Sequence, residues 1–208
     1  MLLSPVGNKI NLNNLTTNVA ETLPFQNRSN IDRLCLSHDG QVLISVDVDG
    51  FALIVNMLKK VVIAHFNFRD KVTALEFSPD NAFFMVATGT KVKIFEAPSA
   101  LAPKTFSPLV LYKKYNNLHS QPVTGVQWTN DSRFFLTWSA NDLTLKLMSL
   151  HKLPNFLPIT FAGNKKPIVK AFFSADNKRV FTIANNGTLL IWRWTEEVST
   201  EAKAVLQF

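Results

Sequence analysis

The chain has 208 residues and a formal net charge of +7 at neutral pH. Apolar residues make up 47% and charged residues 18%, so the chain can bury a hydrophobic core, and general disorder is excluded. The one cysteine, Cys35, excludes disulfides within the chain, and no apolar run approaches the roughly 20 residues that a membrane-spanning helix needs.

The first 30 residues are predicted to hold the second half of a small β-sheet unit. The segment LLSPVGNKINLNNL indicates the end of one strand, a turn and another strand, and TTNVAETLPF indicates one more strand. Set beside the repeat that follows, these are the second, third and fourth strands of a four-stranded unit. We therefore expect residues 1–30 to form the second half of a blade.

A nine-residue pattern then recurs four times. Each copy has apolar residues at positions one, four and six, Ser or Thr at position seven and Asp at position nine. The copies are IDRLCLSHD (31–39), VTALEFSPD (72–80), VTGVQWTND (123–131) and IVKAFFSAD (168–176). Side chains alternate along a strand, so positions four and six share one face. These pairs, predicted to face a neighbouring blade, are Leu34/Leu36, Leu75/Phe77, Val126/Trp128 and Ala171/Phe173.

Further strands are predicted after each copy of the pattern. Second strands are expected at 41–47, 82–88, 133–139 and 179–185, and third strands at 49–55, 89–95, 142–148 and 186–192. Fourth strands are expected at 60–66, 108–114 and 156–162. Four short strands recurring about every 40 to 50 residues predict the blades of a β-propeller. The expected division is blades at 31–71, 72–122 and 123–167, an incomplete blade at 168–195 and a polar tail at 196–208, all within one partial propeller domain.

The third strands resemble those of WD-repeat proteins, in which a Trp closes the strand. Only Trp192 keeps that residue here. His119, Ser139 and Asp142 are expected to retain most of the hydrogen-bond chain typical of a WD blade, with Asn164 in the histidine-like place of the next blade. The predicted fold class is all-β, a WD-repeat β-propeller forming an incomplete arc of about four to five four-stranded blades. Because an arc leaves open strand edges, we expect a fragment, truncated product or partial gene model of a longer protein; a complete small propeller is the alternative.

Several strings resemble one family more closely than WD repeats in general. LLSPVGNKI at the start, AHFNFRDKVTALEFSPD (64–80) and DSRFFLTWSANDLTLKLMS (131–149) are similar to the amino-terminal propeller of the periodic tryptophan protein 2 family. The resemblance implies a scaffold of the UTP-B subcomplex of the small-subunit processome in the nucleolus. It also implies UTP-B proteins, pre-ribosomal RNA and guide small nucleolar RNA as partners.

Catalytic motifs are not found in the sequence. It contains no GxxxxGK[ST], GxGxxG, HExxH or GxSxG motif, and its four histidines fall in different repeats. Asp39, Asp80, Asp131 and Asp176 recur once per copy, which indicates a structural role for them, as for Trp192. We expect no enzyme activity, cofactor, metal, membrane or small-molecule substrate. Two alternatives stay open: a WD scaffold in a translation or trafficking complex, and an enzyme that uses a central channel.

Paired basic residues are the candidate contacts with RNA or protein partners. Lysines on the rims of a propeller can meet phosphates and bind without reading the base sequence, although a merely solvated surface is the alternative. The candidates are Lys59, Lys60, Lys113, Lys114, Lys165 and Lys166. No RNP-type aromatic motif is present, so base-specific recognition is not indicated.

Overall fold

The computed structural model describes residues 2–98, 109–154 and 156–194. Within these ranges the chain forms β-strands and no helix, which confirms the predicted all-β class. No helix in this part of the chain has the length and apolar character needed to cross a membrane.

In the described part of the chain the strands form five separate antiparallel sheets, each made of consecutive strands. The first sheet contains β1 (Leu2–Val6), β2 (Lys9–Asn14) and β3 (Val19–Gln26). The second contains β4 (Ile31–Leu36), β5 (Val42–Asp47), β6 (Phe51–Asn56) and β7 (Val61–Asn67). The third contains β8 (Val72–Phe77), β9 (Phe83–Thr88), β10 (Lys91–Glu96) and β11 (Leu111–Tyr115). The fourth contains β12 (Gly125–Trp128), β13 (Phe134–Trp138), β14 (Thr144–Ser149) and β15 (Ile159–Ala162). The fifth contains β16 (Ile168–Phe173), β17 (Arg179–Ala184) and β18 (Leu189–Arg193).

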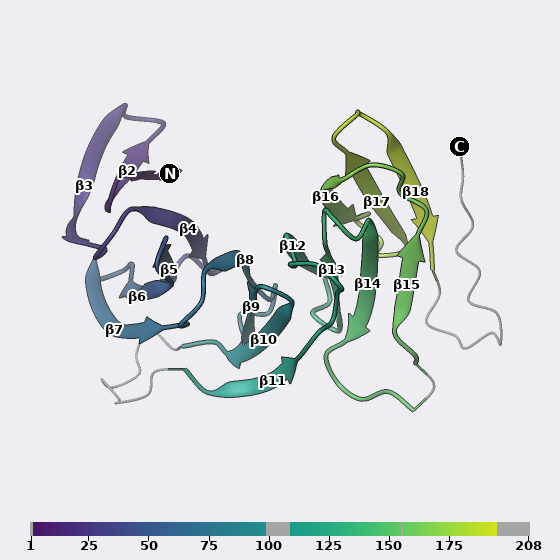
Figure 1. Cartoon of the computed structure of the whole chain (residues 1–208). Coiled ribbons are helices and arrows are strands. Elements are labelled where there is room, and N and C mark those ends of the chain that lie inside the picture. Colours follow the sequence, from purple (N-terminus) through teal and green to yellow (C-terminus); the bar gives the residue numbers. More distant parts are fainter. Residues whose placement is uncertain (1, 99–108, 155, 195–208) are drawn as a thin grey trace.

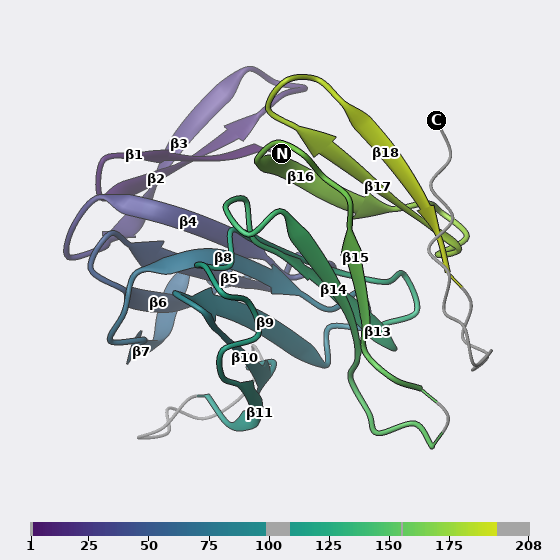
Figure 2. The ribbon, with the colours of Figure 1, turned by 45° about the vertical axis from the view of Figure 1, so that its right-hand side comes forward.

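The five sheets follow one another around an arc, as Figure 1 shows, with the first sheet in purple at one end and the fifth in yellow-green at the other. The strands that carry the nine-residue pattern, β4, β8, β12 and β16, contact one another in sequence along the inner side of the arc. Figure 2 shows the same succession of sheets from a second direction. This is the predicted incomplete arc of propeller blades.

The hydrophobic core consists of four clusters, and each cluster lies between two successive sheets. Positions one, four and six of a copy all pack toward the preceding sheet: Val72, Leu75 and Phe77 join the cluster between the second and third sheets. Strict alternation would put position one on the other face. The register of β8 shifts between Val72 and Ala74, and this β-bulge restores position one to the face of positions four and six. Equivalent shifts occur in β4 and β16.

Leu36 is less buried than the other side chains at position six. Its side chain is 42% exposed, whereas the equivalent Phe77 and Trp128 are 1% and 3% exposed. Phe77 packs beside Cys35 of β4, an inner strand of the sheet before it. Leu36 faces the first sheet, in which β1 is the innermost strand, and it lines an open groove of about 840 Å³ together with Leu2 and Leu3 of β1. Leu36 therefore lies on the side of the neighbouring sheet, as predicted, but it is less buried there than its equivalents.

The first hairpin of each copy closes in the same way, through the Ser/Thr-x-Asp sequence. In the third sheet, Ser78 Oγ donates to Asp80 Oδ1 and accepts from Phe83 N at 2.9 Å, while Asp80 Oδ1 also accepts from Ala82 N at 3.0 Å. The equivalent bonds are made by Ser37 and Asp39, Thr129 and Asp131, and Ser174 and Asp176. All four hairpins thus share one hydrogen-bond arrangement.

Hydrogen bonds also join each of these turns to the next. His38 N donates to Asn81 Oδ1 at 2.7 Å, Asp80 N to Ser132 Oγ at 3.1 Å, and Asn130 N to Asn177 Oδ1 at 3.1 Å. The accepting residues stand directly after the turn aspartates and have positive φ angles of 58°, 59° and 58°. Asn tolerates this left-handed conformation better than most residues do. These hydrogen bonds therefore connect the first hairpin turns of all four sheets in succession, from the second sheet to the fifth.

Candidate functional site

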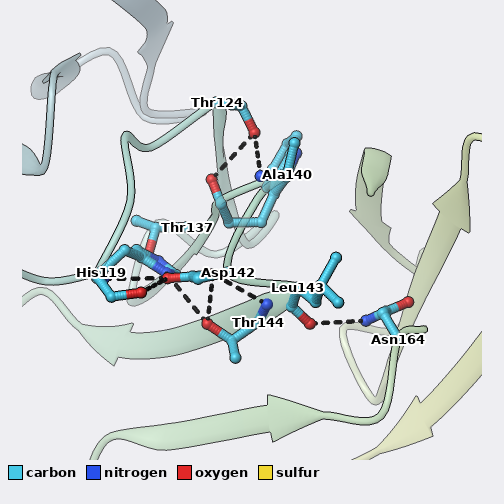
Figure 3. Close-up of polar contacts among 10 residues, drawn as sticks. His119, Thr124, Thr137, Ala140, Asp142, Leu143, Thr144 and Asn164 are labelled. Atoms are coloured by element: carbon cyan, nitrogen blue, oxygen red, sulfur yellow. Dashed lines mark hydrogen bonds and ion pairs between the residues drawn. The ribbon is translucent and has the colours of Figure 1, made fainter. Parts of the chain in front are cut away.

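The most connected group of polar side chains surrounds His119 (Figure 3). The residue lies in the segment between β11 and β12, and its ring Nδ1 is 3.0 Å from Asp142 Oδ2, while Nε2 is 3.0 Å from Thr137 Oγ1. Thr144 Oγ1 donates to Asp142 Oδ1 at 2.8 Å. Asp142 also accepts from the Ser120 backbone N–H at 3.2 Å. The group joins a connecting segment, a second strand and the turn into a third strand.

The network favours a neutral histidine beside an ionised carboxylate. Burial lowers the pKa of His119, although the neighbouring Asp142 opposes that shift. The pKa of Asp142 is also lowered, since bonds from Thr144 and from His119 outweigh the opposing effect of burial. A neutral ring with its proton on Nδ1 donates to Asp142 and accepts the Thr137 hydroxyl hydrogen at Nε2, so both ring nitrogens are satisfied.

The order hydroxyl, imidazole, carboxylate resembles that of a hydrolase triad, but the hydroxyl cannot meet a substrate. Thr137 is 0% exposed and His119 is 3% exposed. Nucleophilic catalysis needs a reacting atom that a substrate can approach. This burial supports a structural role for the network.

The hydroxyl in this network belongs to Thr137 and not to Ser139, so the predicted role of Ser139 is wrong. Ser139 was expected to bond to His119, but its Oγ is buried and makes no hydrogen bond among the described residues. The bonded hydroxyl is Thr137, which lies 18 residues after His119. A buried second-strand hydroxyl must point back under the connecting segment, and Thr137 rather than Ser139 lies within β13.

The same spacing of 18 residues locates the equivalent pair in other sheets. Thr182 Oγ1 donates to Asn164 Oδ1 at 3.1 Å, and Ser45 Oγ donates to Asn27 Oδ1 at 2.7 Å. In the fifth sheet the series of hydrogen bonds continues to Trp192, whose Nε1 is 3.4 Å from Thr182 Oγ1. Trp192 is 1% exposed and packs against the fourth sheet. Asn164 therefore occupies the histidine-like place, as the sequence predicted.

The third sheet fills this place without polar groups. Phe68 stands 18 residues before Val86, and both side chains are buried. The rings of Phe68 and Phe95 lie 6.0 Å apart in an edge-to-face arrangement. The same pair of positions is thus occupied by polar residues in the other sheets with this connection and by apolar residues in the third sheet.

The inner strands bring one partly buried carboxyl group against a neighbouring blade. Glu76 Oε2 accepts from Trp128 N at 3.0 Å, and Trp128 Nε1 is 3.4 Å from Glu76 O. Burial raises the pKa of Glu76 to about 8, although the bond from Trp128 N opposes the shift. Among the described residues, no group of three or more His, Cys, Asp or Glu side chains could hold a metal ion.

The predicted basic pairs do not converge on one surface. Lys59 and Lys60 lie in the turn between β6 and β7, and Lys165 and Lys166 lie between β15 and β16. Turns from third to fourth strands and connections from fourth to first strands leave opposite ends of an antiparallel sheet, so these pairs lie on opposite rims. Lys113 and Lys114 lie within β11, on the outer side of the third sheet.

Internal contacts already engage two of the six candidate lysines. Lys60 Nζ pairs with Glu21 of β3. Lys113 Nζ donates to Leu150 O at 3.1 Å and lies 5.2 Å from the centroid of the Tyr115 ring. Lys59, Lys114, Lys165 and Lys166 are exposed.

A basic cluster that the pairwise reading of the sequence missed surrounds Lys93. Lys93 of β10 lies directly opposite Lys114 of β11, and Lys91 stands two residues away on the same face of β10. Burial lowers the pKa of Lys93, and the charges of Lys114, Lys91 and Arg69 lower it further, while Asp70 opposes them. We call Arg69, Lys91, Lys93 and Lys114 the outer basic cluster. The alternation in KVKI is the sequence signal that could have located it.

Comparison with known proteins shows which proteins this chain is similar to. Residues 57–96 match the model of the WD domain, G-beta repeat. The chain is 37% identical over 194 residues to the periodic tryptophan protein 2 homolog of Schizosaccharomyces pombe, and this match covers 93% of the chain. The chain is therefore similar to members of the periodic tryptophan protein 2 family over almost its whole length. It is also 36% identical over 201 residues to periodic tryptophan protein 2 of Saccharomyces cerevisiae and 31% identical over 192 residues to the mouse homolog.

These matches confirm the resemblance that the sequence predicted. They cover 96% of the chain for the Saccharomyces protein and 92% for the mouse protein. The chain spans about a fifth of each relative: 22% of both fungal periodic tryptophan protein 2 sequences and 20% of the mouse sequence. The matching WD repeat runs from the end of β6 through β10, so it includes Phe68, Lys91 and Lys93.

Proposed function

We propose that this chain contributes a WD-repeat scaffold to the small-subunit processome and supports pre-ribosomal RNA processing in the nucleolus. Its partners would be other UTP-B proteins, with direct contact to pre-ribosomal or small nucleolar RNA. The observation that carries the proposal is the similarity to periodic tryptophan protein 2 along 93% of the chain. The blades provide rims and edges on which several partners can be held at once.

The polar groups of the structure support a scaffold rather than an enzyme. Thr137, His119 and Asp142 are used in joining strands and connections within a blade. Asp39, Asp80, Asp131 and Asp176 are used in the four equivalent hairpin turns. We therefore propose structural roles for these aspartates and for Trp192. We also propose that blades begin at residues 31, 72, 123 and 168, each at the first residue of an inner strand or two residues before it.

The test is affinity purification of the full-length protein with an epitope tag, followed by RNA sequencing and mass spectrometry. We expect enrichment of pre-ribosomal RNA and processome proteins, and a nucleolar signal by microscopy. A protein of the same tag and similar charge that lies outside the nucleolus is the control. Recovery with translation or trafficking factors, and a cytoplasmic signal, would reject the processome in favour of another WD scaffold.

A further inference from the structure

We infer that the outer basic cluster, Arg69, Lys91, Lys93 and Lys114, binds consecutive phosphates of an RNA strand. This inference rests on the proposed function, and it adds a defined site to it. None of the lysine pairs chosen from the sequence forms this site by itself. It arises because the connection after β7 of the second sheet reaches the outer strands of the third.

The fold fixes the position of each cation. The Asn67 side chain accepts the backbone N–H of Arg69 at 2.7 Å, and Arg69 has a φ of +64°, so a tight turn holds it beside the third sheet. Lys91 and Lys93 lie two residues apart on one face of β10, a separation of about 7 Å. Lys114 is the direct cross-strand partner of Lys93. Arg69, Lys91 and Lys114 are exposed, and Lys93 is half-buried between them.

The cluster is electrostatically unfavourable in the isolated chain. Like charges directly opposite each other in an antiparallel pair destabilise a sheet, and here the pair Lys93 and Lys114 has two more cations nearby. The Asp70 carboxylate raises the pKa of Lys93, whereas the three other cations of the cluster lower it. A bound polyanion would reduce this repulsion, and it would stabilise the charged form of Lys93 that burial disfavours.

The composition of the cluster favours nucleic acid over an acidic protein. Lysine is depleted at protein–protein interfaces, whereas lysine and arginine are among the residues that contact phosphate oxygens in complexes with nucleic acid. The four side chains present charge without an aromatic ring among them on which a base could stack. We therefore expect sequence-independent binding of the backbone, with the strong salt dependence that counterion release produces.

The experiment measures binding of the 208-residue chain to a fluorescent 20-nucleotide oligouridylate between 50 and 200 mM salt. The variant is Lys91→Gln/Lys114→Gln, which leaves the half-buried Lys93 in place. The matched control is Lys9→Gln/Lys178→Gln, which removes the same charge from exposed positions in the first and fifth sheets. Thermal unfolding of each protein without RNA checks the fold, and the cluster variant should be at least as stable as the parent because repulsion is reduced.

We expect the cluster variant to bind about 10-fold more weakly at low salt, with the slope of log K against log salt reduced by about 1.4, or roughly 0.7 for each lost phosphate contact on a single strand. The affinity of the control variant for the oligouridylate should fall by no more than about 2-fold. Equal losses in both variants, or no RNA binding by the parent chain, would overturn the site. Polyglutamate that binds the parent as tightly as the oligouridylate, and loses affinity in the cluster variant, would assign the cluster to an acidic protein. None of these outcomes decides the result of the affinity purification, so failure of this site and failure of the proposed processome role can be distinguished.

Discussion

Replacing Thr137 by Val tests whether the network around His119 stabilises the fold. The two side chains have nearly the same shape, so the change removes one hydroxyl from a site that is 0% exposed. His119 Nε2, now 3.0 Å from that hydroxyl, would be left without its partner. An unsatisfied buried polar group costs about 1–3 kcal/mol. At roughly 2–4 °C per kcal/mol for a chain of this size, the melting temperature should fall by about 2–12 °C.

The matched control is Val86→Thr, at the equivalent position of the third sheet. There a new hydroxyl would be buried 18 residues after Phe68, which offers it no acceptor, so we expect a loss of about 1–3 kcal/mol. If only apolar burial mattered, Thr137→Val would raise stability while Val86→Thr would lower it. Urea unfolding measures both. A Thr137→Val protein as stable as the parent would refute the reasoning. The double change His119→Phe/Thr137→Val, which copies the apolar pair, should cost less than the sum of its single changes.

Three further predictions concern the packing between and within the sheets and the protonation of a partly buried carboxyl group. Gly125→Ala would place a Cβ 2.0 Å from the ring of Trp138, and we expect a loss of about 2–3 kcal/mol in urea unfolding. Phe77→Ala should cost about 3–5 kcal/mol, whereas Leu36→Ala, at the same repeat position but 42% exposed, should cost under about 1 kcal/mol; similar losses would contradict the packing described. Glu76 has a pKa raised from 4.5 to about 8, so the folded chain retains a proton that the unfolded chain has released, and stability should fall as pH rises between these values. Glu76→Gln should abolish about 1–2 kcal/mol of this loss between pH 6 and 8, as thermal melts at each pH would show.

The strands could be predicted because their signal is local. The apolar positions and the Ser/Thr-x-Asp turn of each copy lie within nine residues, and the observed inner strands begin within two residues of the predicted ones. Apolar residues at positions one, four and six do not fit the strict alternation of a strand, and the β-bulge near position two accounts for this spacing. The bulge could not be predicted from one copy, but four copies with the same irregular spacing carry the information.

The exposure of Leu36 could not be predicted from the repeat. Its sequence context is that of Phe77, and the difference comes from what lies across the gap between sheets. Phe77 packs beside Cys35 of an inner strand, while Leu36 faces a sheet whose innermost strand is β1. Burial of a side chain depends on the neighbouring element as well as on its own pattern, and that neighbour is 30 or more residues away along the chain.

The hydrogen-bond network shows how a fixed spacing can be more informative than residue type. Asn27, Phe68, His119 and Asn164 share little chemistry, yet each stands 18 residues before its buried partner on a second strand. The connection from a fourth strand passes over the middle of the next sheet at a constant place, so geometry fixes the pairing and the sequence chooses polar or apolar partners. This explains why Ser139 was selected wrongly: it has the right chemistry at the wrong distance.

The outer basic cluster was missed for a related reason. Adjacent lysines in the sequence, such as Lys113 and Lys114, point to opposite faces of a strand, and the structure uses one of them against Leu150 O and leaves the other beside Lys93. A cluster on a sheet is built from alternate residues of one strand and from their cross-strand partners. The charge is therefore concentrated where Lys91 and Lys93, two single basic residues separated by Val92, meet Lys114, the cross-strand partner of Lys93 about 20 residues further along the chain. Neighbouring charges in the sequence identify a basic segment. Only the register of the sheet decides which of these residues can contact the same phosphate backbone at the same time.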